Sequence, residues 1–283
     1  MTSNRASRIA FRCARPLLPA VFLIVACAGG GLKTVDFTDL PAQSASPEEL
    51  VAYINGDGRA ITALKGKLGM GLQKGAGEEV KRCSGMLLAQ NSSRRGLYLK
   101  GYKRLIPTFF TLVSDGGEFW LHIPRDDVVY TGPVEFSWSE EDSLELYLNA
   151  GDLFRALFLR PVDAGASLDV DTGDTEYVIT VYAGDVPARK LWVERKRFTV
   201  VRELYYDGDG TEQLEIQRRE YVDLGGRLYP ASLVLHDLIS GSSVFLEFNS
   251  ITPDPDIVSE SIFRFEVPDG VEVERVDSPR TET

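Results

Sequence analysis

The chain has 283 residues, with 31 Lys and Arg against 42 Asp and Glu, and its formal net charge at pH 7 is −11. A protein with this acidic balance repels nucleic acid and anionic lipid headgroups, so neither is an expected electrostatic partner. The length is sufficient for one large all-β domain with a buried core.

The first 26 residues predict a secretory signal. A basic stretch is followed by an apolar stretch from residue 17 to residue 26. The basic stretch contains Arg5, Arg8, Arg12 and Arg15. Because the apolar stretch is well short of the roughly 20 residues that span a bilayer as a helix, it is not expected to persist as an anchor.

Cys27 follows the apolar stretch in the sequence Leu-Ile-Val-Ala-Cys, which resembles a lipobox. The resemblance implies cleavage before Cys27 and attachment of lipid to its thiol; the alternative is an ordinary signal with a chance cysteine. Two or three acyl chains would hold the protein on a membrane, whereas one chain binds only marginally. The next residue is Ala28 rather than Asp, as in outer-membrane lipoproteins. We therefore expect a lipid-anchored protein of the cell envelope, on the outer membrane and facing the periplasm.

Removal of the signal leaves 257 of the 283 residues, with a net charge of about −15. Cys13 is lost with the signal and Cys27 is expected to be lipidated, so Cys83 remains alone. No intramolecular disulfide is then possible, and Cys83 is expected to be a small apolar residue in a strand.

Residues 27–45 begin with small residues, lack periodicity and are expected to form a lipidated tether. A helix follows, with Ser46 as N-cap, Pro47 in the first turn and Glu49 completing a capping box. It should run to about Asn55, with a further turn possible through Ala63.

Alternation of apolar and polar residues then predicts an antiparallel meander of strands separated by hairpin turns. These strands are expected at residues 68–72, 81–90, 94–103, 108–114, 118–122 and 128–131.

Leucines at helical spacing interrupt the alternation in residues 139–159 and predict one or two helices, broken near Gly151. Strands then resume. They are expected at residues 177–183, 188–194, 199–206, 212–223, 228–235 and 242–251, with a last short strand at 263–267. No break in composition separates domains, so we expect one domain over residues 46–273, followed by a tail at 274–283.

Three short phrases, together with this order of elements, resemble one family. Residues 113–116, Val-Ser-Asp-Gly, precede Phe119 and Trp120 in a hairpin with a displayed turn. Residues 191–193, Leu-Trp-Val, precede Val-Val-Arg at 200–202, and residues 262–273 form a closing element with two phenylalanines and Pro-Asp-Gly. These features resemble the LolA/LolB-like superfamily of lipoprotein carriers and receptors, in its uncharacterised outer-membrane lipoprotein branch.

The resemblance implies a mainly β (α+β) fold: a curved antiparallel half-barrel of about 11–12 strands, with helices covering its concave face. It also implies an apolar cavity for an acyl chain or another apolar ligand, in lipoprotein or lipid transfer. The candidate lining residues are Leu68, Met70, Leu72, Met86, Leu97, Leu99, Phe110 and Leu112. The alternative is that these residues fill a packed core, in a lipoprotein that serves as an interaction module of an envelope complex.

No catalytic residue, metal ligand or cofactor is predicted. The two histidines, His122 and His236, lie in alternating strands without ligand or triad spacing. Residues 169–174 have alternating carboxylates but lack the full calcium-loop pattern. We therefore expect a monomeric protein that is not an enzyme, attached to a membrane through its N-terminal lipid and without a nucleic-acid partner.

Overall fold

The computed structural model describes residues 32–75, 77–92, 95–136, 138, 149–256 and 260–276. Every described element belongs to the compact unit Gly31–Thr283. In this described part, no helix is both long and apolar enough to cross a membrane.

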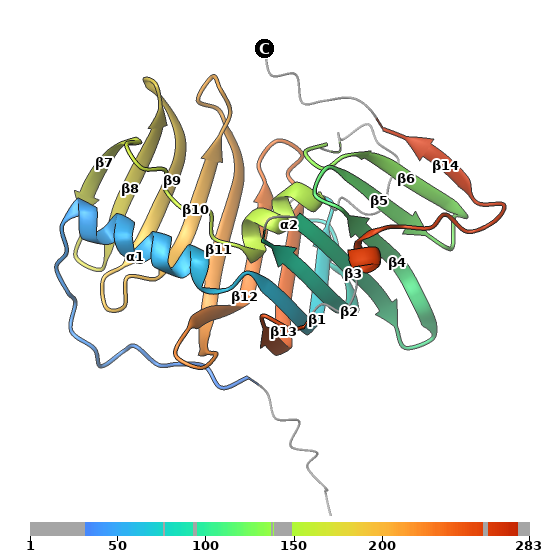
Figure 1. The fold of residues 1–283 in the computed structure, drawn as a ribbon, viewed down its shortest axis with the longest axis horizontal. Coiled ribbons are helices and arrows are strands. Elements are labelled where there is room, and N and C mark those ends of the chain that lie inside the picture. The colour runs from blue at the N-terminus through green and yellow to red at the C-terminus, as the bar shows by residue number, and fades with distance from the viewer. Residues whose placement is uncertain are drawn as a thin grey trace, which may run out of the picture. The chain divides into compact units, whose positions relative to one another are not determined.

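The described residues form one sheet of fourteen strands, in the order β14-β6-β5-β4-β3-β2-β1-β13-β12-β11-β10-β9-β8-β7. Two meanders, β1 to β6 and β7 to β13, join where β1 pairs with β13 in the middle of the sheet (Figure 1). All pairs are antiparallel except β14 with β6. The strands are β1 Ala63–Gln73, β2 Lys81–Asn91, β3 Arg95–Lys103, β4 Ile106–Ser114, β5 Glu118–Ile123, β6 Val128–Pro133, β7 Ser167–Thr172, β8 Glu176–Ala183, β9 Val186–Glu194, β10 Val200–Tyr206, β11 Glu212–Asp223, β12 Leu228–Asp237, β13 Ser243–Pro253 and β14 Glu272–Arg275.

Helix α1, Pro47–Ala60, begins with the predicted capping box: Ser46 and Glu49 each accept a hydrogen bond from the other's backbone N–H. This satisfies two amides that the first turn would otherwise leave unpaired. Leu50 and Ile54 are fully buried against β8, β9 and β10, where they form a small core of their own.

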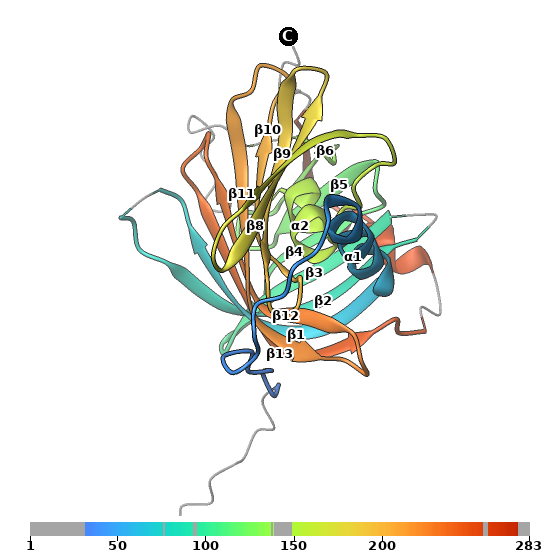
Figure 2. The same ribbon diagram turned by 90° about the vertical axis from the view of Figure 1, so that its left-hand side faces the viewer.

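Helix α2, Ala150–Leu157, has Asn149 as its N-cap and lies on the concave side of the sheet together with α1 (Figure 2). Seven of its eight residues are buried. Its apolar side chains belong to the main core, which is built on the inward-facing residues of β1 to β6 and β11 to β13.

The expected fold class is confirmed: the protein is mainly β, with one curved, open and almost wholly antiparallel sheet. Twelve of its strands correspond to predicted ones. β7 and β14 are additional: β7 contains Asp169 and Asp171 of the acidic segment 169–174, where no strand was predicted, and β14 is only four residues long. Of the helical stretch predicted over residues 139–159, residues 139–148 lie outside the described residues, and the rest contains α2.

The strand predicted at residues 263–267 is wrong. A 3₁₀ turn, Glu260–Phe263, and an irregular segment occupy this place. Phe263 lies against Gly96 on the outer face of β3, and the ring of Phe265 is 5.7 Å from that of His122 on β5. The apolar residues are therefore spaced to cover the outer face of the sheet rather than to alternate within it.

Residues 32–45, predicted as part of a tether, contain no helix or named strand but are held against the sheet. Val35 donates a backbone hydrogen bond to Tyr221, Thr34 forms an isolated bridge with Val222, and Gln43 bonds to Arg195.

Candidate functional site

Seven of the eight predicted lining residues lie together on the concave face. They are Leu68, Met70, Leu72, Leu97, Leu99, Phe110 and Leu112, each at most 5 % exposed. The register explains the grouping, because Leu99 pairs with Leu112 and Gly101 with Phe110, so that these side chains share one face of neighbouring strands.

Met86 is the exception and points to the opposite face of the sheet. It pairs with Lys67 and Lys100 and is 40 % exposed, while its neighbour Leu87 takes the inward position at 2 %. Because successive side chains of a strand alternate between faces, Met86 and Leu87 cannot both line the concave side.

The concave face is filled by α2, whose Leu153, Phe154 and Leu157 pack in the same core as the seven residues above. Among the described residues, two small spaces lie at the ends of the helix. One of about 20 Å³ lies beside Trp138 and Leu153, and one of about 50 Å³ lies between Leu157 and Tyr229. Ligand pockets usually measure roughly 300–1,000 Å³, so an acyl chain requires space that α2 occupies in this conformation.

The C-terminal end of α2 is fastened to the sheet by hydrogen bonds. Arg218 of β11 donates Nη2 to the carbonyl oxygens of Arg155 and Ala156, at 2.9 and 3.3 Å. The Tyr229 hydroxyl of β12 donates to the carbonyl of Leu157 at 3.0 Å. These donors satisfy carbonyls that the last turn of a helix leaves without partners.

The segment that follows α2 is held in the same way. Arg189 of β9 donates Nη1 to the carbonyl oxygen of Arg160 at 2.6 Å. Asn55 of α1 both donates to the carbonyl of Val162, at 2.9 Å, and accepts from its N–H, at 2.7 Å. We call residues 150–162, together held by these contacts, the covering segment.

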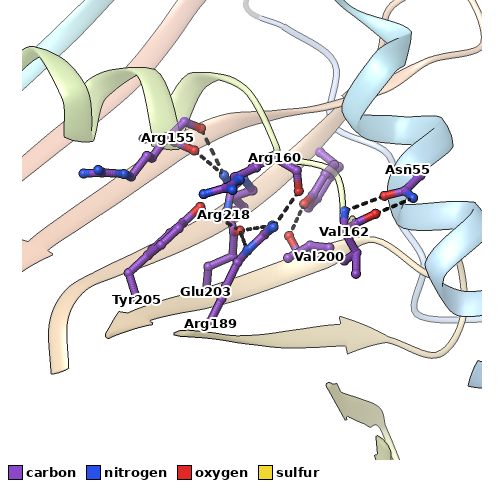
Figure 3. A network of polar contacts seen from close by, with 11 residues as sticks. Asn55, Arg155, Arg160, Val162, Arg189, Val200, Glu203, Tyr205 and Arg218 are labelled. Atoms are coloured by element: carbon purple, nitrogen blue, oxygen red, sulfur yellow. Dashed lines mark hydrogen bonds and ion pairs between the residues drawn. The ribbon is translucent and has the colours of Figure 1, made fainter. Parts of the chain in front are cut away.

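Glu203 of β10 holds the two arginines in place. Its side chain is fully buried and forms ion pairs with Arg189 and Arg218, which are 6 % and 4 % exposed (Figure 3). The Tyr205 hydroxyl donates to Glu203 Oε1 at 3.2 Å. Burial alone would raise the pKa of Glu203, but the two guanidinium groups outweigh it and hold the pKa below its usual value. Burial raises the pKa of Tyr205 to about 12.

Sequence reasoning did not single out these three residues, although a signal was present. Arg189 lies in step with the inward-facing Leu191 and Val193, and Arg218 lies in step with Ile216. A charged residue at an inward position of an alternating strand needs a buried partner, because an unpaired buried charge is very costly.

Other predicted features have ordinary surroundings. Cys83 is half-buried beside the core, and burial raises the pKa of its thiol to about 11, which makes it a poor nucleophile. His236 lies 2.8 Å from the Ser243 hydroxyl on the neighbouring strand. No group of three or more His, Cys, Asp or Glu side chains that could hold a metal occurs within the described ranges.

Comparison with known proteins gives a likeness of fold. No family model matches the chain, and no curated protein matches it in sequence. A domain named for outer membrane lipoprotein sorting, from Vibrio parahaemolyticus, has a TM-score of 0.53 at 10% identity, covering 76% of this chain and 94% of its own. A DUF1329 family protein from Desulfovibrio piger has a TM-score of 0.53 at 13% identity, with the same coverage of 76% and 94%.

A LolA superfamily protein from Nitrosomonas europaea has a TM-score of 0.51 at 12% identity, covering 78% of this chain and 99% of its own. At such identities the comparisons show the fold. The predicted LolA/LolB-like resemblance is therefore confirmed as a likeness of fold.

Proposed function

We propose that this protein is a lipid-anchored component of the bacterial cell envelope that binds an acyl chain or another apolar ligand on its concave face. Its role would be lipoprotein or lipid transfer at the outer membrane. The LolA-like fold supports this proposal, since one neighbour is named for lipoprotein sorting. The apolar residues gathered on the concave face supply a hydrocarbon-like surface.

The observation that carries the proposal is the covering segment. α2 fills the concave face, yet its end is fixed to the sheet by a few hydrogen bonds, and small spaces lie at both of its ends. An acyl chain of about 16 carbons gains on the order of 13 kcal/mol when it leaves water. In this proposal such a chain replaces the apolar side chains of α2 in the core.

Ligand content is the first test. The unit Gly31–Thr283 contains all described strands and both cores, so it serves as the soluble protein. Native mass spectrometry with lipid extraction, on protein purified from its own host, should show stoichiometric lipid or acylated peptide. The extracted ligand should then displace a fluorescent fatty acid from the protein. An empty protein that neither binds nor releases the probe contradicts the proposal.

The role of the covering segment is tested by a pair of tyrosines that line the same small space. Tyr229→Phe removes the bond to Leu157 of α2, while Tyr221→Phe removes a bond to Val200 within the sheet. One net hydrogen bond is worth about 1 kcal/mol, so Y229F should speed fatty-acid uptake about fivefold in stopped-flow fluorescence. Y221F is the matched control and should leave the rate unchanged; equal effects would show that α2 does not gate binding.

The filled core favours a second function, that of a non-transferring interaction module. Apolar side chains are exposed at hairpin ends, including Leu105 and Ile239. This alternative predicts no apolar ligand, and co-purification of a stoichiometric protein partner that L105S or I239S releases.

The lipid anchor is tested directly. Protein recovered from the membrane fraction of its host should begin at Cys27 and carry a mass increment of two or three acyl chains. An intact signal or an unmodified Cys27 contradicts this part of the proposal.

A further inference from the structure

The positive charge of the chain is concentrated in one part of the sheet. Residues 61–114, which contain β1 to β4, have ten Lys and Arg against two acidic residues, a formal net charge of +8. The whole chain carries −11, so the remainder is strongly acidic. The net charge of the protein therefore conceals a basic region.

The outward-facing side chains of β1, β2 and β3 gather this charge on one surface, the basic face. It is defined by Lys65, Lys67, Arg82, Met86, Tyr98 and Lys100. The register places Lys67, Met86 and Lys100 in one row across the three strands, and Lys65, Leu88 and Tyr98 in the next. None of the outward positions of these three strands holds an acidic residue.

The cations of the basic face are available to a partner. Within the described ranges, no ion pair involves Lys65, Lys67, Arg82 or Lys100. Neighbouring strands are about 4.8 Å apart, so Lys67 and Lys100 lie at about 10 Å and repel each other. On the neighbouring strand β13, Glu247 pairs in register with Gly69, and Asp254, just beyond the end of that strand, is paired with Arg227. An anionic surface would relieve this repulsion.

We propose that the basic face docks the folded domain on the surface of an anionic lipid bilayer. Apolar side chains accompany the cations: Met86 is 40 % exposed within the face, and Leu105, beside Arg104 in the β3–β4 hairpin, is 90 % exposed. The headgroup region of a bilayer accepts both kinds of group, whereas the phosphates of a nucleic acid would use the cations alone. Repulsion of the acidic remainder orients the molecule with this face toward the membrane.

This contact is separate from the lipid on Cys27 and needs no ligand on the concave face. It is tested with the unit Gly31–Thr283, which lacks Cys27, by sedimentation with vesicles of phosphatidylcholine alone or with phosphatidylglycerol added. Binding should require phosphatidylglycerol and weaken with salt. Each basic residue near an anionic surface contributes about fivefold in affinity, so the double variant Lys67→Gln and Lys100→Gln should bind about 25-fold more weakly.

The matched control makes the same change of charge elsewhere, with Lys190→Gln and Arg219→Gln on β9 and β11, and should bind as the parent does. Lys65→Gln with Arg82→Gln is a second pair on the basic face, used if the first fails a circular dichroism check of folding. Absence of binding, equal binding to both vesicle types or an equal loss in the control overturns the proposal. A single-stranded DNA oligonucleotide bound as tightly as the anionic vesicles would overturn it in favour of a nucleic-acid site.

Discussion

Glu203 shows how one residue determines the position of a whole segment. It is the acidic partner of Arg189 and Arg218, and these two arginines supply donors to the covering segment. Replacement of a buried ion-pair network by apolar residues can be tolerated, but removal of one partner leaves uncompensated charge behind. The carboxylate of Glu203 therefore stabilises the covering segment indirectly, through the two arginines that it holds in place.

We expect Glu203→Gln to lower the free energy of unfolding by about 3–5 kcal/mol, because two buried guanidinium groups lose their counter-charge. Urea titration measures this loss. Glu215→Gln, which breaks the more exposed pair with Arg202, is the control and should cost at most about 1 kcal/mol. The pKa of Glu203 is lowered in the folded state, so its contribution is present above pH 4.5 and is lost as the pH falls below that value. The difference in free energy of unfolding between E203Q and the parent should become smaller in acid. A difference that does not change with pH contradicts the stabilising role of the Glu203 charge.

The face of the sheet on which a residue lies could be predicted from the sequence only where the alternation of apolar and polar residues fixed the phase of the strand. Leu68, Met70 and Leu72 follow one another on one face because glycines separate them, so their inward placement follows from alternation. In Met86-Leu87-Leu88 three apolar residues follow in sequence, and either phase fits the pattern. Register with β1, which the sequence does not specify, places Leu87 inward.

At the scale of elements, α1 was predictable because its start depends on neighbouring residues alone. Ser46, Pro47 and Glu49 fix the first turn through local hydrogen bonds. Its end was harder, since Asn-Gly-Asp-Gly continues as helix to Ala60 where a stop was expected near Asn55. Asn55 bonds to Val162 and Gly58 lies against Leu159, so contacts with the segment after α2 support the extra turn. Such tertiary contacts have no local signal.

Asp57 in that extra turn gives a prediction at the element scale. The residue is exposed as a whole, but the packed segments beside it desolvate its carboxyl and raise the pKa to about 6. A raised folded pKa means that stability is fullest below pH 3.8 and is lost as the pH rises through about 6. Asp57→Asn should therefore raise the free energy of unfolding by about 1 kcal/mol at pH 8 and leave it unchanged at pH 4. The value at pH 8 allows for the screening of this partly exposed carboxyl by solvent.

Thermal unfolding at the two pH values measures this effect. Asp209→Asn, in the exposed turn between β10 and β11, is the control for the same chemical change at a site outside this contact. A gain for D57N at pH 4 equal to that at pH 8 contradicts the explanation by desolvation.

For the whole molecule, the central seam between β1 and β13 is the decisive feature. Lys65 pairs with Thr252 and Leu72 with Val244, so the middle of the sheet joins strands from opposite ends of the domain (Figure 1). The order of elements along the chain predicted two meanders. Pairing between strands so far apart in the sequence produces no periodic pattern of residues that could predict it. The pattern predicted the antiparallel strands and the family resemblance implied one curved, open sheet, whereas the seam itself was not predicted.

We expect a chain that ends at Asp237 to lack cooperative unfolding, because β1 and β12 both lose their partner β13. A chain that ends at Gly270 loses only the peripheral β14 and should retain a cooperative transition. Calorimetry and hydrogen exchange distinguish the two, and the amides of β1 should be the first to lose protection in the shorter chain. Cooperative unfolding of the shorter chain would show that each meander folds by itself.

β7 and β14 are the edge strands of the open sheet, and within the part of the chain that the structure describes each pairs on one side only. Such edges are templates on which further copies of a chain can add, which is the usual route to aggregation of β proteins. Here Asp169 and Asp171 are exposed along β7, and Glu272 and Glu274 along β14. Two copies that approach edge to edge at neutral pH therefore bring carboxylates together. An open architecture is thus kept soluble by the charges at its margins, and it becomes prone to self-association where acid neutralises them.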